Sequence, residues 1–403
     1  MKKKPTVALF TKKIATTVTA IGFLVFTFTV GALTVSKNRD TLFDFDGDTL
    51  WGKCILAKEQ TLTAFNENIV GFDRFLSVYG TVQNLIGATV YEDAGYTYLI
   101  KDTRGYLHFY TKEQDPTPYA DKVAALNEAL GKENIPLIYL QAPTKETKGF
   151  TVFPVGIDYA NDKNSDAMLA ALRARGVNVL SFREEFLGEG TDHDTVFYRT
   201  DHHWTTEAAF AAFAKTVPYL NEQLGWSLDT TFTDTENWQR ITQKKSFLGS
   251  IGRRLGKELS GLDDYTFLEP KFETEYEILY PYQPYSWKGT LHETMVRDSV
   301  LYAEDVSANR YASYFQYDYG QLLIDNKKAD NDLRIAVIKD SFALPFTAFF
   351  STTVAHIDMI DLREFKGNLT EHLLQTKPDL VLILYGNGSF SPQMYEFDKT
   401  VSE

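Results

Sequence analysis

Short apolar runs that alternate with helical stretches constrain the fold of this chain more than any other feature. Four such runs are "IPLIYLQAP" at 135–143, "VNVLSF" at 177–182, "LRIAVIKD" at 333–340 and "DLVLILYGN" at 379–387. Continuous runs of this kind are typical of strands that are buried on both faces. Because stretches with helical periodicity separate them, the sequence predicts a parallel sheet covered by helices on both faces.

The connecting segments refine this prediction. Residues 117–131, 161–175, 206–223 and 366–376 have helical periodicity, and "TVAHIDMID" at 353–361 reads as a further strand. The region from about 225 to 330 loses the periodicity and is rich in tyrosine, which indicates an insertion. Its tyrosines would line a groove for sugar rings or serve as half-buried packing, and the sequence leaves both open.

The N-terminal segment belongs to a different class of structure. Five lysines precede an uncharged run from Ile14 to Val35 that is long enough to cross a bilayer as a helix. Lysines ahead of the span favour a cytoplasmic N-terminus. A signal peptide cleaved after Ala32 is the alternative, and in both cases the residues after about 40 lie outside the cytoplasm.

These observations predict the organisation of the chain. We expect a cytoplasmic basic segment at 1–13, a signal-anchor or transmembrane helix at 14–35, an N-terminal helical and β-hairpin lead-in at 36–115, and an α/β domain at 116–403 with the insertion at about 225–330. In the lead-in, residues 59–87 have helical periodicity, and strands are expected near 98–101 and 107–110.

Net charge and cysteine content exclude a nucleic-acid partner and an intrachain disulfide. The net charge is −13, whereas binding to phosphate backbones needs a basic face, so no nucleic-acid partner is expected. Cys54 is the only cysteine, so the chain has no intrachain disulfide. No cofactor is expected.

The segment "YRTDHHWTTEAAF" at 198–210 carries the first group with chemical potential. Asp201 and His203 lie two residues apart in a non-helical stretch, so they can point the same way. A carboxylate can then hold one ring N–H of the histidine and leave the other nitrogen as a general base. His202 would point to the other side and make a structural hydrogen bond. Trp204 would pack as an apolar side chain that fixes the conformation of the loop.

Ser341 is the matching candidate nucleophile. It follows directly on the strand expected at 333–340 and begins the next helix. That position exposes the hydroxyl and presents backbone N–H groups to a developing oxyanion. A serine alone at this point is an ordinary helix cap, but together with Asp201 and His203 it favours nucleophilic catalysis.

A family resemblance rests on these motifs. "FYRTDHHWTTEAA", followed by "IAVIKDSF", "IDMIDLREF" and "PDLVLILYGN", resembles the DHHW family, which is similar to the SGNH-hydrolase-like proteins of alginate and cell-wall polysaccharide O-acetylation. The likeness extends to "FDRF", "LQAPTK" and "FLGSIGRR", and so to nearly the whole chain beyond the N-terminal apolar run.

The resemblance implies an SGNH-hydrolase-like three-layer α/β sandwich with a circularly permuted parallel sheet. It also implies a triad of Ser341, His203 and Asp201, with Asn387 as an oxyanion-hole residue. The surrounding "YGNGSF" departs from the Gly-x-Asn-Asp block of the family. Arg363, Arg253 and Trp204 complete the candidate substrate-binding residues.

The activity that the resemblance implies is O-acetyl transfer to a cell-surface or extracellular polysaccharide, or an accessory role in it. A membrane-bound acyltransferase would supply the acetyl groups, and the N-terminal helix would hold the chain at the cell membrane. A secreted form after signal cleavage is the alternative location.

Three other functions remain open. A polysaccharide acetylesterase would use the same triad with water as acceptor. A metal-dependent hydrolase would need His193, Asp201 and one of His202 or His203 as ligands, which is disfavoured because neighbouring side chains diverge and no zinc-binding spacing occurs. A non-catalytic glycan-binding or scaffold protein would keep the fold and lose the chemistry.

Overall fold

The computed structural model describes residues 6–39, 69–283, 285–315, 317–386 and 390–399. The chain divides into two compact units, Met1–Val82 and Gln83–Glu403. The second unit begins at Gln83 and so includes the small sheet that precedes residue 115. The domain boundary expected at residue 115 stays a prediction.

The first unit contains the long helix α1 (Thr6–Lys37). Its segment Thr16–Lys37 is long and apolar enough to cross a membrane, a property shared by anchors and signal sequences. Within the same unit, the ring of Phe75 from α4 (Phe72–Leu85) meets Phe26 edge to face, with ring centroids 5.6 Å apart. The helix expected from residue 59 begins outside the described residues.

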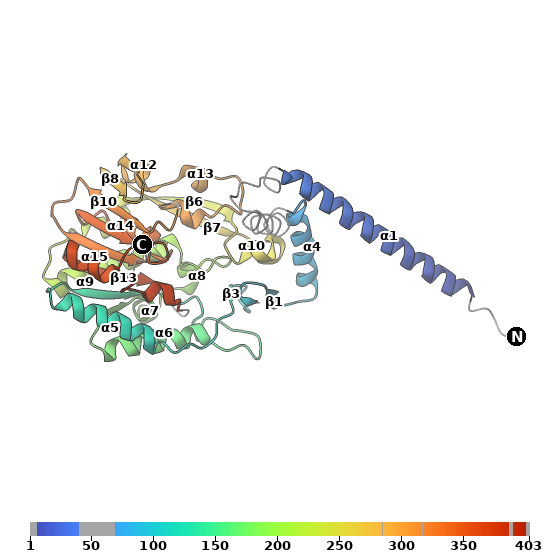
Figure 1. The fold of residues 1–403 in the computed structure, drawn as a ribbon, viewed down its shortest axis with the longest axis horizontal. Helices are drawn as coiled ribbons and strands as arrows, with labels where there is room; N and C mark the ends of the chain where they lie inside the picture. The colour runs from blue at the N-terminus through green and yellow to red at the C-terminus, as the bar shows by residue number, and fades with distance from the viewer. Residues whose placement is uncertain (1–5, 40–68, 284, 316, 387–389, 400–403) are drawn as a thin grey trace, which may run out of the picture. The chain divides into compact units, whose positions relative to one another are not determined.

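The second unit is built on an eight-stranded sheet (Figure 1). Its strands are β4 (Leu137–Gln141), β5 (Asn178–Ser181), β8 (Tyr276–Tyr280), β9 (Tyr285–Gly289), β10 (Gln321–Asn326), β11 (Arg334–Lys339), β12 (His356–Ile360) and β13 (Leu380–Tyr385). Their spatial order is β5-β4-β13-β11-β12-β10-β8-β9. The last strand of the chain, β13, pairs with β11 on one side and with β4 on the other.

The parallel sheet expected from the sequence accounts for the first five strands in this order. The other three, β10, β8 and β9, are antiparallel and come from the region expected to be an insertion, so the sheet is mixed. All six residues of β13 are buried, whereas β9 has no fully buried residue. A strand at a solvated edge needs no apolar run, which explains why sequence patterning missed it.

Helices cover both faces of the sheet, as in the expected three-layer sandwich. One face carries α5 (Thr117–Gly131), α6 (Ala160–Ala174) and α15 (Leu369–Thr376), and the other carries α9 (Thr206–Leu224) and α14 (Ala343–Phe350). Side chains of β11 alternate between the two layers: Val337 packs with α9 and α14, whereas Ile338 packs with α5 and α15. The fold is thus an α/β sandwich whose mixed sheet has five parallel strands on the β5 side and three antiparallel strands on the β9 side.

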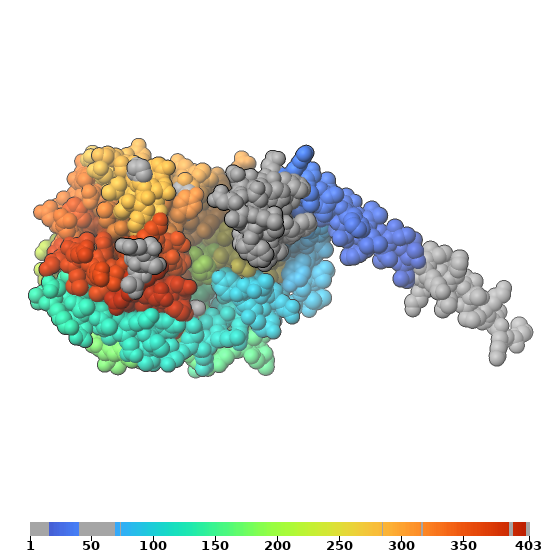
Figure 2. Space-filling view, viewed as in Figure 1, coloured from blue at the N-terminus to red at the C-terminus, as the bar shows by residue number. Residues whose placement is uncertain are grey.

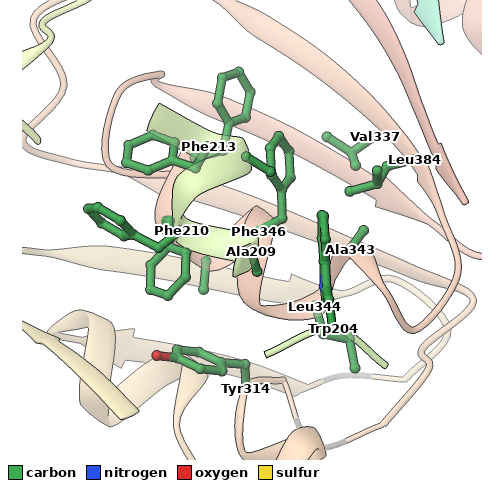
Figure 3. Packing of buried hydrophobic residues seen from close by; sticks show 14 of the residues in the cluster. Trp204, Ala209, Phe210, Phe213, Tyr314, Val337, Ala343, Leu344, Phe346 and Leu384 are labelled. Carbon is green, nitrogen blue, oxygen red and sulfur yellow. The ribbon is translucent and has the colours of Figure 1, made fainter. Parts of the chain in front are cut away.

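Aromatic side chains fill the layer between the sheet and α9. Phe210 and Phe213 of α9 pack beside Phe346 of α14, near Val337 of the sheet and Trp204 of the preceding loop (Figure 3). Truncation of one such phenylalanine to alanine costs about 3–5 kcal/mol of stability. Thr205 caps α9 by accepting the Ala208 N–H at 3.0 Å, as the sequence indicated.

Two smaller sheets complete the unit. β1 (Val90–Asp93), β2 (Thr97–Lys101) and β3 (Leu107–Phe109) form an antiparallel sheet that contains the expected hairpin, and β6 (Trp238–Phe247) pairs with β7 (Asp263–Pro270). The short helices are α7 (Phe182–Gly188), α8 (His193–Val196), α10 (Gly252–Leu255), α11 (Lys257–Ser260), α12 (Leu291–Met295), α13 (Asp298–Leu301), η1 (Thr231–Thr233), η2 (Thr235–Asn237), η3 (Arg310–Ser313) and η4 (Pro392–Tyr395).

The C-terminal segment closes the second unit on the side of α5. Residues near the C-terminus, red in Figure 2, lie beside the teal surface of α5, and η4 contacts that helix. The circular permutation implied by the family resemblance stays a prediction.

Candidate active site

The turn between β11 and α14 presents Ser341. β11 ends at Lys339 and α14 begins at Ala343, so the serine lies at the carboxyl end of a central strand. Asp340 fixes this turn: its Oδ1 accepts the Phe342 N–H at 2.9 Å, and its Oδ2 accepts the Gly386 N–H at 2.7 Å. The second bond ties the serine turn to the end of the neighbouring strand β13.

Asp201, His203 and Ser341 form a continuous hydrogen-bonded line. His203 Nδ1 lies 2.6 Å from Asp201 Oδ1, and His203 Nε2 lies 2.7 Å from Ser341 Oγ. Because a carboxylate accepts hydrogen bonds, Nδ1 carries the proton and Nε2 accepts the hydroxyl of the serine. Asp201 and His203 are buried, whereas Ser341 is partly exposed. The structure thus brings together the three residues that the sequence singled out, although Ser341 follows His203 by 138 positions in the chain.

Asp201 remains ionised despite its burial. Burial alone would raise the pKa of this carboxyl, but the imidazoles of His203 and His202 and the Ser250 N–H hold it well below its usual range. The Ser250 N–H donates to Asp201 Oδ2 at 2.6 Å. A Cβ at Gly249 would collide with the Cβ of Asp201, so only glycine lets this backbone approach so closely.

Lys145 anchors the loop that carries Asp201. Its ammonium donates to the carbonyl oxygens of Asp201, Leu107 and Arg199 at 2.6, 2.7 and 3.0 Å. The side chain is buried, which lowers the pKa of Lys145 to about 8. Three backbone acceptors converging on one buried cation fix the loop against β3.

Tyr311 and Trp204 join the histidine loop to the serine turn. The rings of Tyr311 and His203 stack, with centroids 3.8 Å apart and planes 8° from parallel. Trp204 Nε1 donates to Tyr311 Oη and to the Phe342 carbonyl, both at 3.0 Å. Trp204 has no exposed surface, so it acts as the plug of the loop and does not contact substrate.

His202 does not point away from His203 as the sequence suggested. The two rings are 3.7 Å apart, because residues 199–203 form bends and not an extended strand in which side chains alternate. His202 Nδ1 shares a hydrogen bond with Ser250 Oγ at 2.7 Å, in line with the structural role expected for it.

The same histidines have the spacing of a metal site. Ligand atoms of Asp201, His202 and His203 lie within 4.8 Å of one another. His193, the other ligand considered for a metal, packs instead against the rings of Phe150 and Phe197. Both nitrogens of His203 and both oxygens of Asp201 already have hydrogen-bond partners, so an ion would have to break the line to Ser341.

A cavity of about 570 Å³ opens over Ser341. Its wall includes residues from the "LQAPTK" segment, from β3 and the residues after it, and from the serine turn: Pro143, Thr144, Lys145, His108–Gln114, His202 and Asp340–Phe342. Among the described residues, the backbone N–H of Ser341 has no acceptor, whereas those of Phe342 and Ala343 both donate. The free N–H is a candidate oxyanion donor.

The remaining predicted site residues differ in position. Arg363 lines the cavity and pairs with Asp361, its Nε lying 2.9 Å from Asp361 Oδ1. Arg253 is not among the residues that line the cavity; it donates to the Ser307 carbonyl at 3.0 Å and so braces a loop. Asn387 lies outside the described residues.

Sequence reasoning missed the residues that hold the site in shape. Asp340 stood inside the quoted "KDSF", Lys145 inside "LQAPTK" and Ser250 inside "FLGSIGRR", so each lay in a motif that carried the resemblance. Tyr311 had no such signal, because nothing distinguished it from the other tyrosines of its region.

Comparisons with known proteins agree with this architecture. Residues 105–254 match the family model of the SGNH hydrolase-like domain, acetyltransferase AlgX. No curated protein sequence matches the chain.

Two solved structures share the fold. PatB1 of Bacillus cereus, in a structure with a sulfonyl adduct, has a TM-score of 0.62 at 20% identity and covers 77% of this chain and 100% of its own. A DHHW family protein from Eubacterium siraeum DSM 15702 has a TM-score of 0.59 at 16% identity, covering 78% of this chain and 100% of its own. The SGNH-hydrolase-like fold and the resemblance to DHHW proteins are therefore confirmed.

Proposed function

We propose that this chain is a serine-dependent acyl-ester enzyme that transfers acetyl groups to hydroxyls of a cell-surface or extracellular polysaccharide. The line from Asp201 through His203 to Ser341, with its 2.6 and 2.7 Å hydrogen bonds and its end in a cavity, supports this most. The match of residues 105–254 to a family model named for an acetyltransferase supports the reaction class.

In the first half of the reaction, Ser341 Oγ attacks the carbonyl carbon of an acetyl ester. His203 Nε2 takes the hydroxyl proton, and Asp201 stabilises the imidazolium that forms. The Ser341 N–H, at the start of the turn into α14, faces the developing oxyanion. Collapse of the tetrahedral intermediate breaks the ester bond, and His203 returns the proton to the departing alcohol.

In the second half, an acceptor hydroxyl attacks the acetyl-serine. His203 now removes the proton of the acceptor, and Ser341 leaves with a proton from the same imidazole. A sugar hydroxyl as acceptor gives transfer, and water gives hydrolysis. We assign transfer as the main reaction, with the acetylesterase as the alternative, because a tethered chain would receive acetyl groups from a membrane-bound acyltransferase.

The location follows from the first unit. Thr16–Lys37 of α1 would hold the chain in the cell membrane and leave the second unit outside the cytoplasm. Fractionation of cells that express the chain with a C-terminal tag tests this. An intact chain in the membrane fraction, digestible from outside, supports the anchor; a shortened chain in the medium supports cleavage and secretion.

Covalent labelling tests the chemistry. A sulfonyl fluoride should modify the wild-type chain at Ser341, and the Ser341→Ala variant should stay unmodified; the sulfonyl adduct of PatB1 suggests this reagent class. Labelling elsewhere, or none, together with full cellular function of Ser341→Ala, would favour the non-catalytic scaffold.

Product analysis separates transfer from hydrolysis. A small acetyl ester is supplied with and without a neutral oligosaccharide, and mass spectrometry detects the acetylated sugar. Acetate alone, released at the same rate with and without the sugar, would indicate the esterase. Loss of activity after dialysis against a chelator would favour the metal-dependent alternative.

A further inference from the structure

A second hollow adjoins the cavity over Ser341. It has a volume of about 520 Å³, and Arg363 lines both hollows. Four tyrosines dominate its wall: Tyr280, Tyr282, Tyr317 and Tyr319. The other lining residues lie just before β10 and in the loop after β12.

The topology of the sheet explains why the two hollows are neighbours. β11 and β12 are parallel, so their carboxyl ends meet at one edge, where Ser341 follows β11 and Arg363 follows β12. β10 is antiparallel to β12 and to β8, so β8 ends at this same edge with Tyr280. The tyrosine hollow thus extends the ligand-binding edge of the α/β sheet.

The four tyrosines form one connected aromatic group. Tyr280 meets Tyr282 and Tyr319 with ring centroids 5.6 and 5.0 Å apart, and Tyr317 meets Tyr319 at 5.8 Å. All three pairs are edge to face, which fixes the rings against one another. Tyr317 is 58% exposed and is the most accessible member of the group.

The wall of the hollow is tightly built. The Tyr282 hydroxyl accepts the Lys366 N–H at 2.9 Å, and the Lys366 ammonium lies 5.2 Å from the centre of the Tyr282 ring. A Cβ at Gly320 would collide with the Glu364 carbonyl oxygen, so this glycine lets two loops close on each other. The hollow is therefore held open by fixed side chains, which lowers the entropic cost of binding.

The charges around Arg363 are already balanced. Its guanidinium pairs with Asp361 at 2.5 Å and with Asp318 at 3.1 Å, and the buried ammonium of Lys339 pairs with the same two carboxylates. These two cations and two carboxylates balance one another. Lys366 and Glu364, the other charged residues of the wall, have opposite signs, so the lining offers an anionic sugar no net positive charge. The net charge of −13 on the whole chain also repels polyanions.

We propose that the tyrosine hollow binds a neutral pyranose unit of the acceptor polysaccharide, one or more units away from the sugar whose hydroxyl reaches Ser341. Flat aromatic faces suit the apolar C–H faces of such rings, and the phenol hydroxyls suit their OH groups. This inference rests on the proposed function, since it names the class of acceptor that the same site would take.

Binding measurements on the full-length chain test the inference. The chain is kept in a detergent without sugar headgroups and titrated with cellohexaose, chitohexaose and a hexamer of galacturonate. At least one of the two neutral hexamers should bind, and the anionic hexamer should bind more weakly. Tyr317→Ala should weaken the neutral hexamer about five- to tenfold, and Tyr317→Phe should restore most of the affinity.

Two further variants make the test decisive. Tyr302→Ala removes a comparably exposed tyrosine outside the hollow and should bind as wild type does. Ser341→Ala should bind the hexamer with wild-type affinity while it hydrolyses no acetyl ester, so a failure of the chemistry and a failure of the hollow are separately visible. Absence of neutral binding, tighter binding of galacturonate, or equal affinities of Tyr317→Ala and Tyr302→Ala would overturn the inference.

Discussion

Two buried carboxylates flank the candidate active site, and their environments drive them in opposite directions. Asp201 accepts three N–H hydrogen bonds, one of them from the ring of His203, and the ring of His202 also lies close to it. Its pKa lies well below the usual value. Burial raises the pKa of Asp340 to about 6, because its two N–H donors and the more distant charges of Arg363 and His203 offset the burial only in part. Burial alone therefore does not set the charge of a carboxyl; the number and charge of its partners do.

The difference assigns the two residues separate tasks. Asp201, which its lowered pKa keeps ionised at neutral pH, can hold one tautomer of His203 and stabilise its protonated form. Asp340 clamps the serine turn through backbone hydrogen bonds and titrates near neutral pH. We expect substitutions at the Asp201 end of the line to abolish the chemistry and those at Asp340 to change the pH dependence of stability.

The largest effect is expected from Ser341→Ala, which removes the proposed nucleophile. The rate of acetyl-ester hydrolysis should fall by roughly 10⁴-fold or more. The melting temperature should stay close to wild type, because the hydroxyl is partly exposed. Ester hydrolysis by purified chains, followed by absorbance, measures the change. A residual rate within tenfold of wild type would contradict a nucleophilic role.

Asp201→Asn should come next, with a loss of roughly 10³- to 10⁴-fold in kcat. The amide is close in shape to the carboxylate but cannot stabilise the imidazolium, and it can turn an N–H toward His203. The KM for a small ester should change little. The matched change is Asp340→Asn, whose kcat at neutral pH should fall by less than Asp201→Asn. Equal losses in the two variants would remove the distinction drawn between the carboxylates.

Asp340→Asn should instead change the pH dependence of stability. The pKa of Asp340 is about 6 in the folded chain and 3.8 without burial, so between pH 4 and 6 the folded state keeps a proton that the unfolded state releases. Stability is therefore lost as the pH rises through this window, by on the order of 2–3 kcal/mol in total. The asparagine does not titrate, so its stability relative to wild type should improve from pH 4 to 7. Urea unfolding at both pH values measures this.

Asp201 provides the contrast in sign. Because the pKa of Asp201 is lower in the folded chain than its ordinary value of 3.8, it contributes stability that is fully present above pH 3.8. That stability is lost as the pH falls through the pKa of the folded chain. An unchanged slope between pH 4 and 6 in Asp340→Asn would mean that another group titrates there.

The smallest effect is expected from His202→Gln. The amide can keep a hydrogen bond to Ser250 Oγ, and neither bond of His203 to its partners changes. Activity should stay within about tenfold of wild type, because positioning contacts outside the reacting line cost less than the line itself. Steady-state kinetics check this. A loss as large as that of Asp201→Asn would mean that His202 takes part in proton transfer or metal binding.

The sequence predicted the parts of the fold that depend on strong local patterns. The strands around residues 139, 180, 337 and 382 are continuous apolar runs, and the helices beside them have helical periodicity, with side-chain caps on α9 and α15. The antiparallel strands β8, β9 and β10 were missed because they carry mixed residues and are fixed by their partners, and of the three only β9 lies at the edge of the sheet. The order of strands in a sheet is likewise a property of packing, which local patterns do not encode.

The same limit applies to the site. Asp201, His203 and Ser341 were recognisable because their chemistry and their position relative to strand ends are local properties. The stacking of Tyr311 on His203, the three carbonyls around Lys145 and the approach of Gly249 to Asp201 join segments far apart in the chain. No pattern within any one of these segments announces such contacts. The bends at 199–203, which turn His202 toward His203, also result from these tertiary contacts.

The place of β13 in the sheet has a consequence for when the protein matures. Among the described strands it comes last along the chain, yet it lies between β4 and β11, and the N–H of Gly386, which follows it, donates to Asp340. A chain still being synthesised holds both histidines and the serine but has a gap at its centre. The turn that carries Ser341 can therefore take its final form, and the line from Asp201 to Ser341 can close, only after β13 has been synthesised.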